Sequence, residues 1–93
     1  MGAISGLILT PSGRPAADCS VVPEAISHPR PPIPEMMLVT GPDGRYRWPL
    51  PPGTYRLTAR CVDPASGGRQ ITGTVTDLVV GPGDEVTADI ALD

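Results

Sequence analysis

The search for acid–base chemistry begins at His28, because it is the only histidine in the chain. It lies between Ser27 and Pro29 in a proline-rich stretch, where no regular element would hold it beside a nucleophile. A general base must lie within hydrogen-bond reach of the proton that it removes. We therefore interpret His28 as an exposed loop residue, and we predict no catalytic residue and no enzymatic activity.

The other reactive groups are too sparse to form a site. Asp84 and Glu85 are adjacent, next to a turn, and are typical of solvated carboxylates. The run Gly67-Gly68-Arg69 lacks the lysine and the following helix of a phosphate-binding loop. Two separated cysteines and one distant histidine are too few ligands for zinc, and the aspartates are too scattered for a calcium loop. We expect no metal and no cofactor.

Cys19 and Cys61 are the only cysteines, and both fall at positions where alternation predicts an inward side chain. Two interpretations stay open. The pair can be buried free thiols that behave as small apolar side chains. Alternatively, it can bridge two strands, which would contribute about 3–4 kcal/mol in the chain-entropy description.

Length and composition restrict the class of protein. The chain has 93 residues, which predicts a single domain over residues 1–93. A net charge of −3 without any lysine argues against nucleic-acid binding. No apolar run approaches the roughly 20 residues that cross a bilayer, so we expect no membrane insertion. No basic segment followed by an apolar run precedes the first alternating segment, so we expect no signal peptide.

Alternating polar and apolar residues separated by turn residues predict short β-strands at intervals of about ten residues. No segment shows the apolar spacing of a helix. Seven strands in one open sheet would leave one face wet, so the pattern predicts an all-β, seven-stranded, Ig-like sandwich of two sheets. The expected strands cover residues 3–9, 17–22, 36–40, 45–48, 54–62, a stretch within 70–80, and 85–92.

The connections carry their own predictions. Asp43-Gly44 predicts a hairpin between the third and fourth strands. The sixth strand is long enough to contain a bulge near Gly73. Prolines 23, 29, 31, 32 and 34 predict an extended loop over residues 23–35, because proline cannot join the interior of a ladder.

Three stretches resemble the carboxypeptidase regulatory-like domain family, and together they span nearly the whole chain. The opening reads Ile4-Ser5-Gly6-Leu7-Ile8, followed by Pro11-Ser12-Gly13-Arg14-Pro15-Ala16. The middle reads Gly41-Pro42-Asp43-Gly44-Arg45-Tyr46-Arg47, then Leu50-Pro51-Pro52-Gly53-Thr54-Tyr55-Arg56-Leu57. The ending is Val86-Thr87-Ala88-Asp89-Ile90-Ala91-Leu92.

The resemblance implies a prealbumin-like (transthyretin-like) sandwich, related to collagen-adhesin B-type repeats. It also implies a mostly non-catalytic attachment to a larger protein or particle. Within such a fold, Gly44 makes a tight turn and Gly53 lets the chain cross the end of the sandwich. Tyr46, Trp48 and Tyr55 then supply the large apolar area of a core that has no phenylalanine.

Two candidate binding surfaces remain. Arg45, Arg47, Arg56 and Arg60 alternate with core residues and should point outward. If their strands are neighbours in one sheet, the four cations share a face that suits an acidic partner or a sulfated glycan, although a solvated face is the commoner outcome. The other candidate is the proline-rich loop, whose apolar groups could dock in a partner's groove. Its candidate residues are Pro31, Pro32 and Ile33, together with Met36 directly after it, although Met36 can equally begin the third strand with its side chain in the core.

We therefore expect a non-enzymatic structural module that binds protein partners in a larger assembly, with self-association as one option. A virion or tail accessory protein is favoured over a cytoplasmic one, and part of a surface protein is the next version. A carbohydrate-binding module is the first alternative, and it would need exposed aromatic rings. The second alternative is a cytoplasmic subunit that docks by edge-strand pairing.

Overall fold

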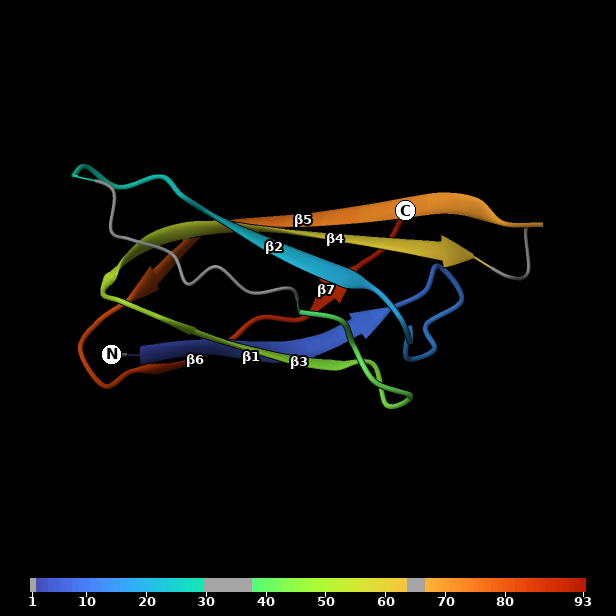
Figure 1. The fold of residues 1–93 in the computed structure, drawn as a ribbon, viewed down its shortest axis with the longest axis horizontal. Coiled ribbons are helices and arrows are strands. Elements are labelled where there is room, and N and C mark those ends of the chain that lie inside the picture. Colours follow the sequence, from blue (N-terminus) through green and yellow to red (C-terminus); the bar gives the residue numbers. More distant parts are fainter. Residues whose placement is uncertain (1, 30–37, 64–66) are drawn as a thin grey trace.

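The computed structural model describes residues 2–29, 38–63 and 67–93 of the chain. They form seven strands in two sheets that lie one above the other in Figure 1, and no helix occurs in the described residues. The predicted all-β sandwich of two sheets is confirmed. The strands are β1 (Gly2–Leu9), β2 (Ser20–Ala25), β3 (Arg45–Leu50), β4 (Gly53–Asp63), β5 (Arg69–Val80), β6 (Glu85–Thr87) and β7 (Ile90–Ala91).

The upper sheet has the order β2-β4-β5, and both of its pairings are antiparallel. The lower sheet has the order β3-β1-β6, and β7 also pairs with β1. Alternate residues of every long strand face the space between the sheets, for example Ile4 and Ile8 of β1 and Leu57 and Ala59 of β4, all fully buried. The outer faces of both sheets are left to solvent.

The last predicted strand is wrong in one respect, because residues 85–92 do not form one continuous strand. β6 and β7 both run parallel to β1, but the ladder breaks between them. At the break, the Asp89 Oδ1 atom accepts a hydrogen bond of 3.0 Å from the Leu7 N–H. A side chain thus takes the place of a backbone carbonyl. Ala88, Ile90 and Leu92 still face the core, as alternation requires.

The second strand begins and ends three residues later than predicted, and Pro23 lies within it. Pro23 pairs with Leu57 of β4, so the expectation that the loop starts at this proline is wrong. The reason is the phase of the ladder. Val21 donates its N–H to Leu38, away from β4. Backbone direction alternates along a strand, so the N–H that Pro23 lacks would also point away from β4.

The turn at residues 41–44 forms, but it is not a hairpin. Gly44 donates to the Gly41 carbonyl at 3.0 Å and has a φ of 71°, which favours glycine. The chain before the turn bridges β2 through Val39 and Ser20, whereas β3 after the turn pairs with β1. The turn therefore carries the chain from one sheet to the other. The expected strand at 36–40 is reduced to this single bridge, and residues 36 and 37 lie outside the described residues.

The bulge in β5 lies elsewhere than predicted. Gly73 is regularly paired with Ala59, and the register shifts where Tyr55 and Leu57 of β4 oppose Leu78 and Val75. Thr76 and Asp77 together oppose the single residue Arg56, so β5 has one extra residue there, and Asp77 has a φ of 59°. A Cβ atom at position 73 would overlap the carbonyl oxygen of Ala91. Glycine is required there by close approach of the C-terminal segment and not by a bulge.

Cys19 and Cys61 are joined in a disulfide, which decides between the two interpretations of the sequence. Cys19 directly precedes β2, and Cys61 lies in β4, so the bridge connects neighbouring strands whose Cα atoms are 4.4 Å apart. It closes a sequence separation of 42 residues. The bridge joins the start of β2 to the far end of β4, at the right-hand side of Figure 1.

Candidate interaction surfaces

The three ring side chains are inside the sandwich. Tyr46, Trp48 and Tyr55 are 5%, 2% and 0% exposed. Each uses its polar atom on a backbone carbonyl: the Tyr46 hydroxyl donates to Ala88, the Trp48 Nε1–H donates to Val21 at 3.0 Å, and the Tyr55 hydroxyl donates to Pro51 at 2.6 Å. All aromatic rings of the chain are therefore in the core, and none can stack on a ligand at the surface.

Burial also removes the tyrosines from acid–base chemistry near neutral pH. Loss of solvent raises the pKa of the Tyr46 phenol well above its ordinary value, and the nearby negative charge of Asp89 raises it further. Burial likewise raises the pKa of the Tyr55 phenol. Both phenols remain protonated hydrogen-bond donors. They hold the chain segments that they contact and do not exchange protons.

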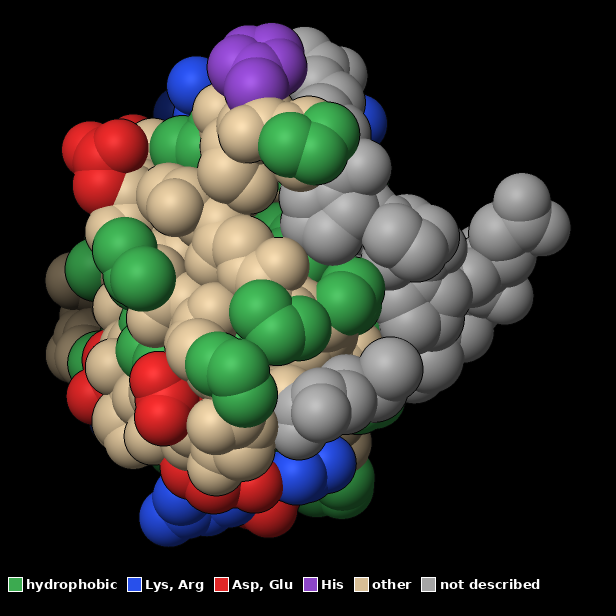
Figure 2. All heavy atoms as spheres, turned by 90° about the vertical axis from the view of Figure 1, so that its left-hand side faces the viewer, with side chains coloured by type: hydrophobic (Ala, Val, Ile, Leu, Met, Phe, Trp, Pro, Cys, Tyr) green, Lys and Arg blue, Asp and Glu red, His purple; other side chains and the backbone are tan. Residues whose placement is uncertain are grey.

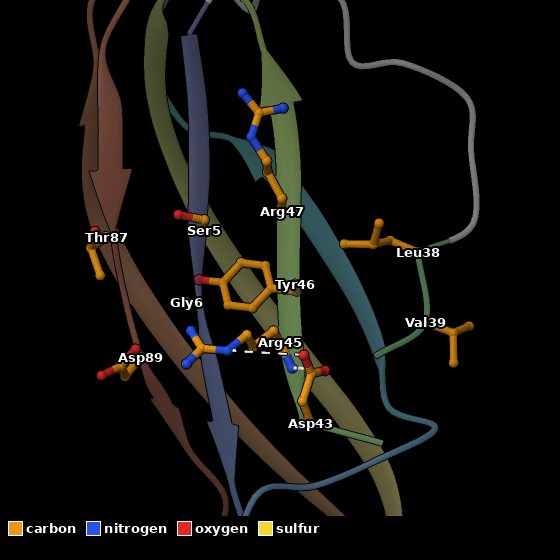
Figure 3. A pocket seen from close by; sticks show the side chains of 10 residues that line it. All are labelled: Ser5, Gly6, Leu38, Val39, Asp43, Arg45, Tyr46, Arg47, Thr87 and Asp89. Atoms are coloured by element: carbon orange, nitrogen blue, oxygen red, sulfur yellow. Dashed lines mark hydrogen bonds and ion pairs between the residues drawn. The ribbon is translucent and has the colours of Figure 1, made fainter. Parts of the chain in front are cut away.

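The lower sheet carries a shallow hollow of about 580 Å³ on its outer face, shown in Figure 3. β1 contributes Ser5 and Gly6 to its lining, and β3 contributes Arg45, Tyr46 and Arg47. The guanidinium of Arg45 lies over β1, between Asp43 and Asp89, whereas Arg47 extends away along β3. Leu38 closes one side.

The cations of this hollow already have carboxylate partners. Arg45 Nε lies 3.9 Å from Asp43 Oδ2, and Arg47 Nη2 lies 2.7 Å from Glu85 Oε1. Asp89 adds a further negative charge to the rim. Figure 2 shows basic and acidic side chains together along the lower margin of the molecule, on the side of this sheet. The hollow is electrically balanced and does not select an anion.

The four arginines do not share a face. Arg45 and Arg47 lie on β3 in the lower sheet, whereas Arg56 and Arg60 lie on β4 in the upper sheet. All four side chains are exposed, but they are divided between opposite sides of the sandwich. Arg56 is further engaged with Glu24 at 3.2 Å. The predicted cationic face for an acidic partner or a sulfated glycan is therefore wrong.

The remaining candidates give no chemical site. His28 is exposed. Within residues 2–29, 38–63 and 67–93, no group of three or more metal-binding side chains comes together. Nor does that part of the chain contain a helix that could cross a bilayer. The apolar groups proposed for the proline-rich loop lie outside the described residues, namely Pro31, Pro32, Ile33 and Met36.

Sequence reasoning missed a set of apolar side chains that point outward. Val22, Val39, Val62 and Val79 are exposed, and they are the large hydrophobic residues exposed among those described. Three of them lie on strands of the upper sheet, and Val39 bridges the edge of that sheet. The signal was present, because Val22 and Val62 fall one residue out of phase with the inward positions of their strands.

A two-layer β-sandwich with all rings in its core and paired charges on its surface defines a structural class of module and not a reaction. The sequence profile of the carboxypeptidase regulatory-like domain matches residues 3–93. The match covers more than half of the chain, so the chain belongs to the carboxypeptidase regulatory-like domain family. Domains of this family are non-catalytic. Among curated proteins, no sequence matches the chain significantly.

Proposed function

We propose that this chain is a non-enzymatic interaction module that decorates or links a larger assembly. An accessory protein of a virion or tail is the favoured version, and a part of a surface protein is the next. Such a module acts by being attached in one position and by contacting a neighbour. Its outer faces and loops are then the working surfaces, because the inward face of each sheet is consumed by the core.

One observation carries the proposal, namely the use of every aromatic ring in the core while four valines remain exposed. Aromatic and polar groups that could orient a small ligand are spent on internal hydrogen bonds. The exposed valines, by contrast, contribute nothing to the core and increase the apolar area in contact with water. Val22, Val62 and Val79 lie on the outer face of the upper sheet, which is a surface that a contacting protein would cover.

The two alternatives have less support. A carbohydrate-binding module needs exposed rings on which sugars stack, and Trp48 is 2% exposed. Docking by edge-strand pairing needs free backbone donors along an edge. This condition fails at the edge formed by β2, where the Val21 N–H is bonded to Leu38 and Pro23 has no N–H to offer. β5 is the other edge of the same sheet, so this argument counts against docking at the β2 edge.

The test is to fractionate the cells or particles that contain the chain and to quantify the chain in each fraction with a specific antibody. The proposal expects the chain to co-purify at a fixed ratio with one particle or surface fraction, and to stay there through a density gradient. Recovery of the chain mainly as a free species in the soluble fraction would contradict it. A multi-subunit enzyme as the co-purifying partner would instead favour the role of an enzyme-attached module.

A further inference from the structure

The outer face of the β2-β4-β5 sheet differs in chemistry from the rest of the surface. Val22 is 55% exposed, Val62 62% and Val79 66%. Between them lie threonines, which continue the β-branched surface; Thr58 is half-buried, and Thr72 and Thr74 are exposed. We call this surface the valine–threonine face. It is the upper side of the sandwich in Figure 1.

The face is built of four parallel columns of residues. From one edge of the sheet to the other, the columns are the segment at residues 38–40, then β2, β4 and β5. One row across the columns reads Val39, Ser20, Arg60, Thr72, and the next reads Val22, Thr58, Thr74. The line between β2 and β4 therefore divides the face into two halves of two columns each.

One pair of opposite charges lies symmetrically about this line, whereas Arg60 and Asp77 have no charged counterpart across it. Glu24 of β2 and Arg56 of β4 are directly opposite in register and 3.2 Å apart. A two-fold axis parallel to the strands, running along the line between β2 and β4, exchanges these two columns. It brings Glu24 of one copy over Arg56 of a second copy, and Arg56 over Glu24. No like charges meet in that row.

The same axis suits the neighbouring rows. Arg60 of one copy faces Ser20 of the other, and Val22 faces Thr58. A two-fold axis across the strands through the central row of Thr58 would instead set Arg60 over Arg56, which is unfavourable because two cations would be desolvated together. The register thus distinguishes between the two symmetric ways of stacking this face on itself, and it favours the axis along the strands.

The opposite outer face has no such match. It carries five charged side chains, against four on the valine–threonine face (Glu24, Arg56, Arg60 and Asp77), and both faces contain ion pairs within the copy. The five are Asp43, Arg45, Arg47, Glu85 and Asp89. Covering those side chains would desolvate several charges at once. The valine–threonine face has fewer charges and more β-branched surface, so it loses less and gains more on contact.

From these observations we propose that the valine–threonine face binds a second copy of the chain, face to face, about a two-fold axis that runs between β2 and β4. The inference deepens the proposed function and rests on it, because it names the partner of the same non-catalytic module. Two sheets stacked in this way cross at about 30°, so the central rows make the register-specific contacts.

The area of the valine–threonine face limits the affinity of the proposed dimer. Three strands spaced by about 4.8 Å and six or seven residues long, together with the three-residue segment 38–40, cover roughly 400 Å² per copy. Stable complexes bury about 800 Å² per partner. The dimer is therefore reversible, with a dissociation constant of about 10⁻⁴ M or weaker, and it fills when copies are concentrated on an assembly.

Sedimentation equilibrium of the purified chain, from about 10 µM to about 1 mM, tests the proposal across the range where such a constant operates. The expected result is a monomer at the low end and a rising dimer fraction at the high end. Thr58→Arg, at the centre of the face, should leave a monomer throughout. Thr87→Arg, on the opposite face, is the matched control and should leave the dimer intact, with circular dichroism verifying that both variants fold.

Charge exchange tests the register. Glu24→Arg alone, or Arg56→Glu alone, puts like charges opposite each other at two symmetric positions and should raise the dissociation constant at least tenfold. The double exchange E24R/R56E restores opposite charges and should return the constant to within about threefold of the parent value. A double variant as weak as the single ones would overturn the proposed axis.

Cross-linking of variants that each carry one added cysteine, with the Cys19–Cys61 disulfide intact, gives an independent result. Val22→Cys and Thr58→Cys should cross-link when the two variants are mixed and not when either is alone, since Val22 of one copy faces Thr58 of the other. A strictly monomeric parent chain, or a dimer that survives Thr58→Arg, would refute the proposal. Either result would leave the fractionation test of the assembly role unaffected, so the two hypotheses can fail separately.

Discussion

Removal of the disulfide gives the largest stability change that the structure predicts. Replacing Cys19 and Cys61 together by alanine keeps both positions small and apolar, as two buried side chains require. In the chain-entropy description, opening a loop with a sequence separation of 42 residues costs about 4 kcal/mol at 25 °C. A chain of 93 residues has a free energy of unfolding of about 5–14 kcal/mol, so the change removes more than a quarter of it.

Urea unfolding followed by far-ultraviolet circular dichroism measures the loss in the free energy of unfolding, and thermal unfolding measures the change in melting temperature. The melting temperature should fall by roughly 15–30 °C, because about 1 kcal/mol corresponds to 4–8 °C in a domain of this size. Alkylation of the native chain without reductant should label no thiol, and alkylation after reduction and unfolding should label both cysteines. A loss below about 1 kcal/mol, or two labelled thiols in the native chain, would refute the reasoning.

Three other perturbations follow from the core. Trp48→Phe removes the indole donor to the Val21 carbonyl and leaves a small void, so the free energy of unfolding should fall by about 2–4 kcal/mol in urea titrations read by circular dichroism. Because the pKa of Tyr46 and of Tyr55 is raised in the folded chain, the unfolded chain releases protons first as the pH passes 10.0. Stability should therefore be unaffected by these groups at lower pH and fall above it, and tyrosinate absorbance should appear only on unfolding. Gly73→Ala should destabilise by about 1–3 kcal/mol, because its Cβ meets a fixed backbone carbonyl; an unchanged melting temperature would contradict that clash.

The fold was predictable because alternation and turn residues report on local geometry. Tyr46 and Trp48 lie two residues apart in one strand, and both were expected to face the core; they do. What alternation cannot report is which strands are neighbours. Arg47 and Arg56 are both outward residues, yet β3 and β4 belong to different sheets, so outward did not mean the same side.

The sequence also could not show toward which neighbouring strand each backbone N–H group points. Whether a proline is tolerated in a strand depends on the direction in which its missing N–H would point, and that direction depends on the neighbouring strand. Pro23 was therefore placed in a loop although it pairs with Leu57. Asp89 illustrates the same limit, since its carboxylate completes the ladder at Leu7, 82 residues earlier in the chain.

Prolines in the edge strands β2 and β3 explain why a partner should contact the outer face of a sheet and not these two edges. Ala3 donates its N–H to Asp84, away from β3, so its partner Pro49 also points its missing donor away from β1. Pro23 does the same on β2. Both edges therefore lack a donor at the position where an added strand would seek one, and strand addition needs such donors at every second residue. β5 and β6 are the other edge strands, but strand addition at any edge would leave the outward side chains of Val22, Val62 and Val79 exposed. Burial of these valines therefore requires another surface that covers the sheet, as a second copy of the same face would.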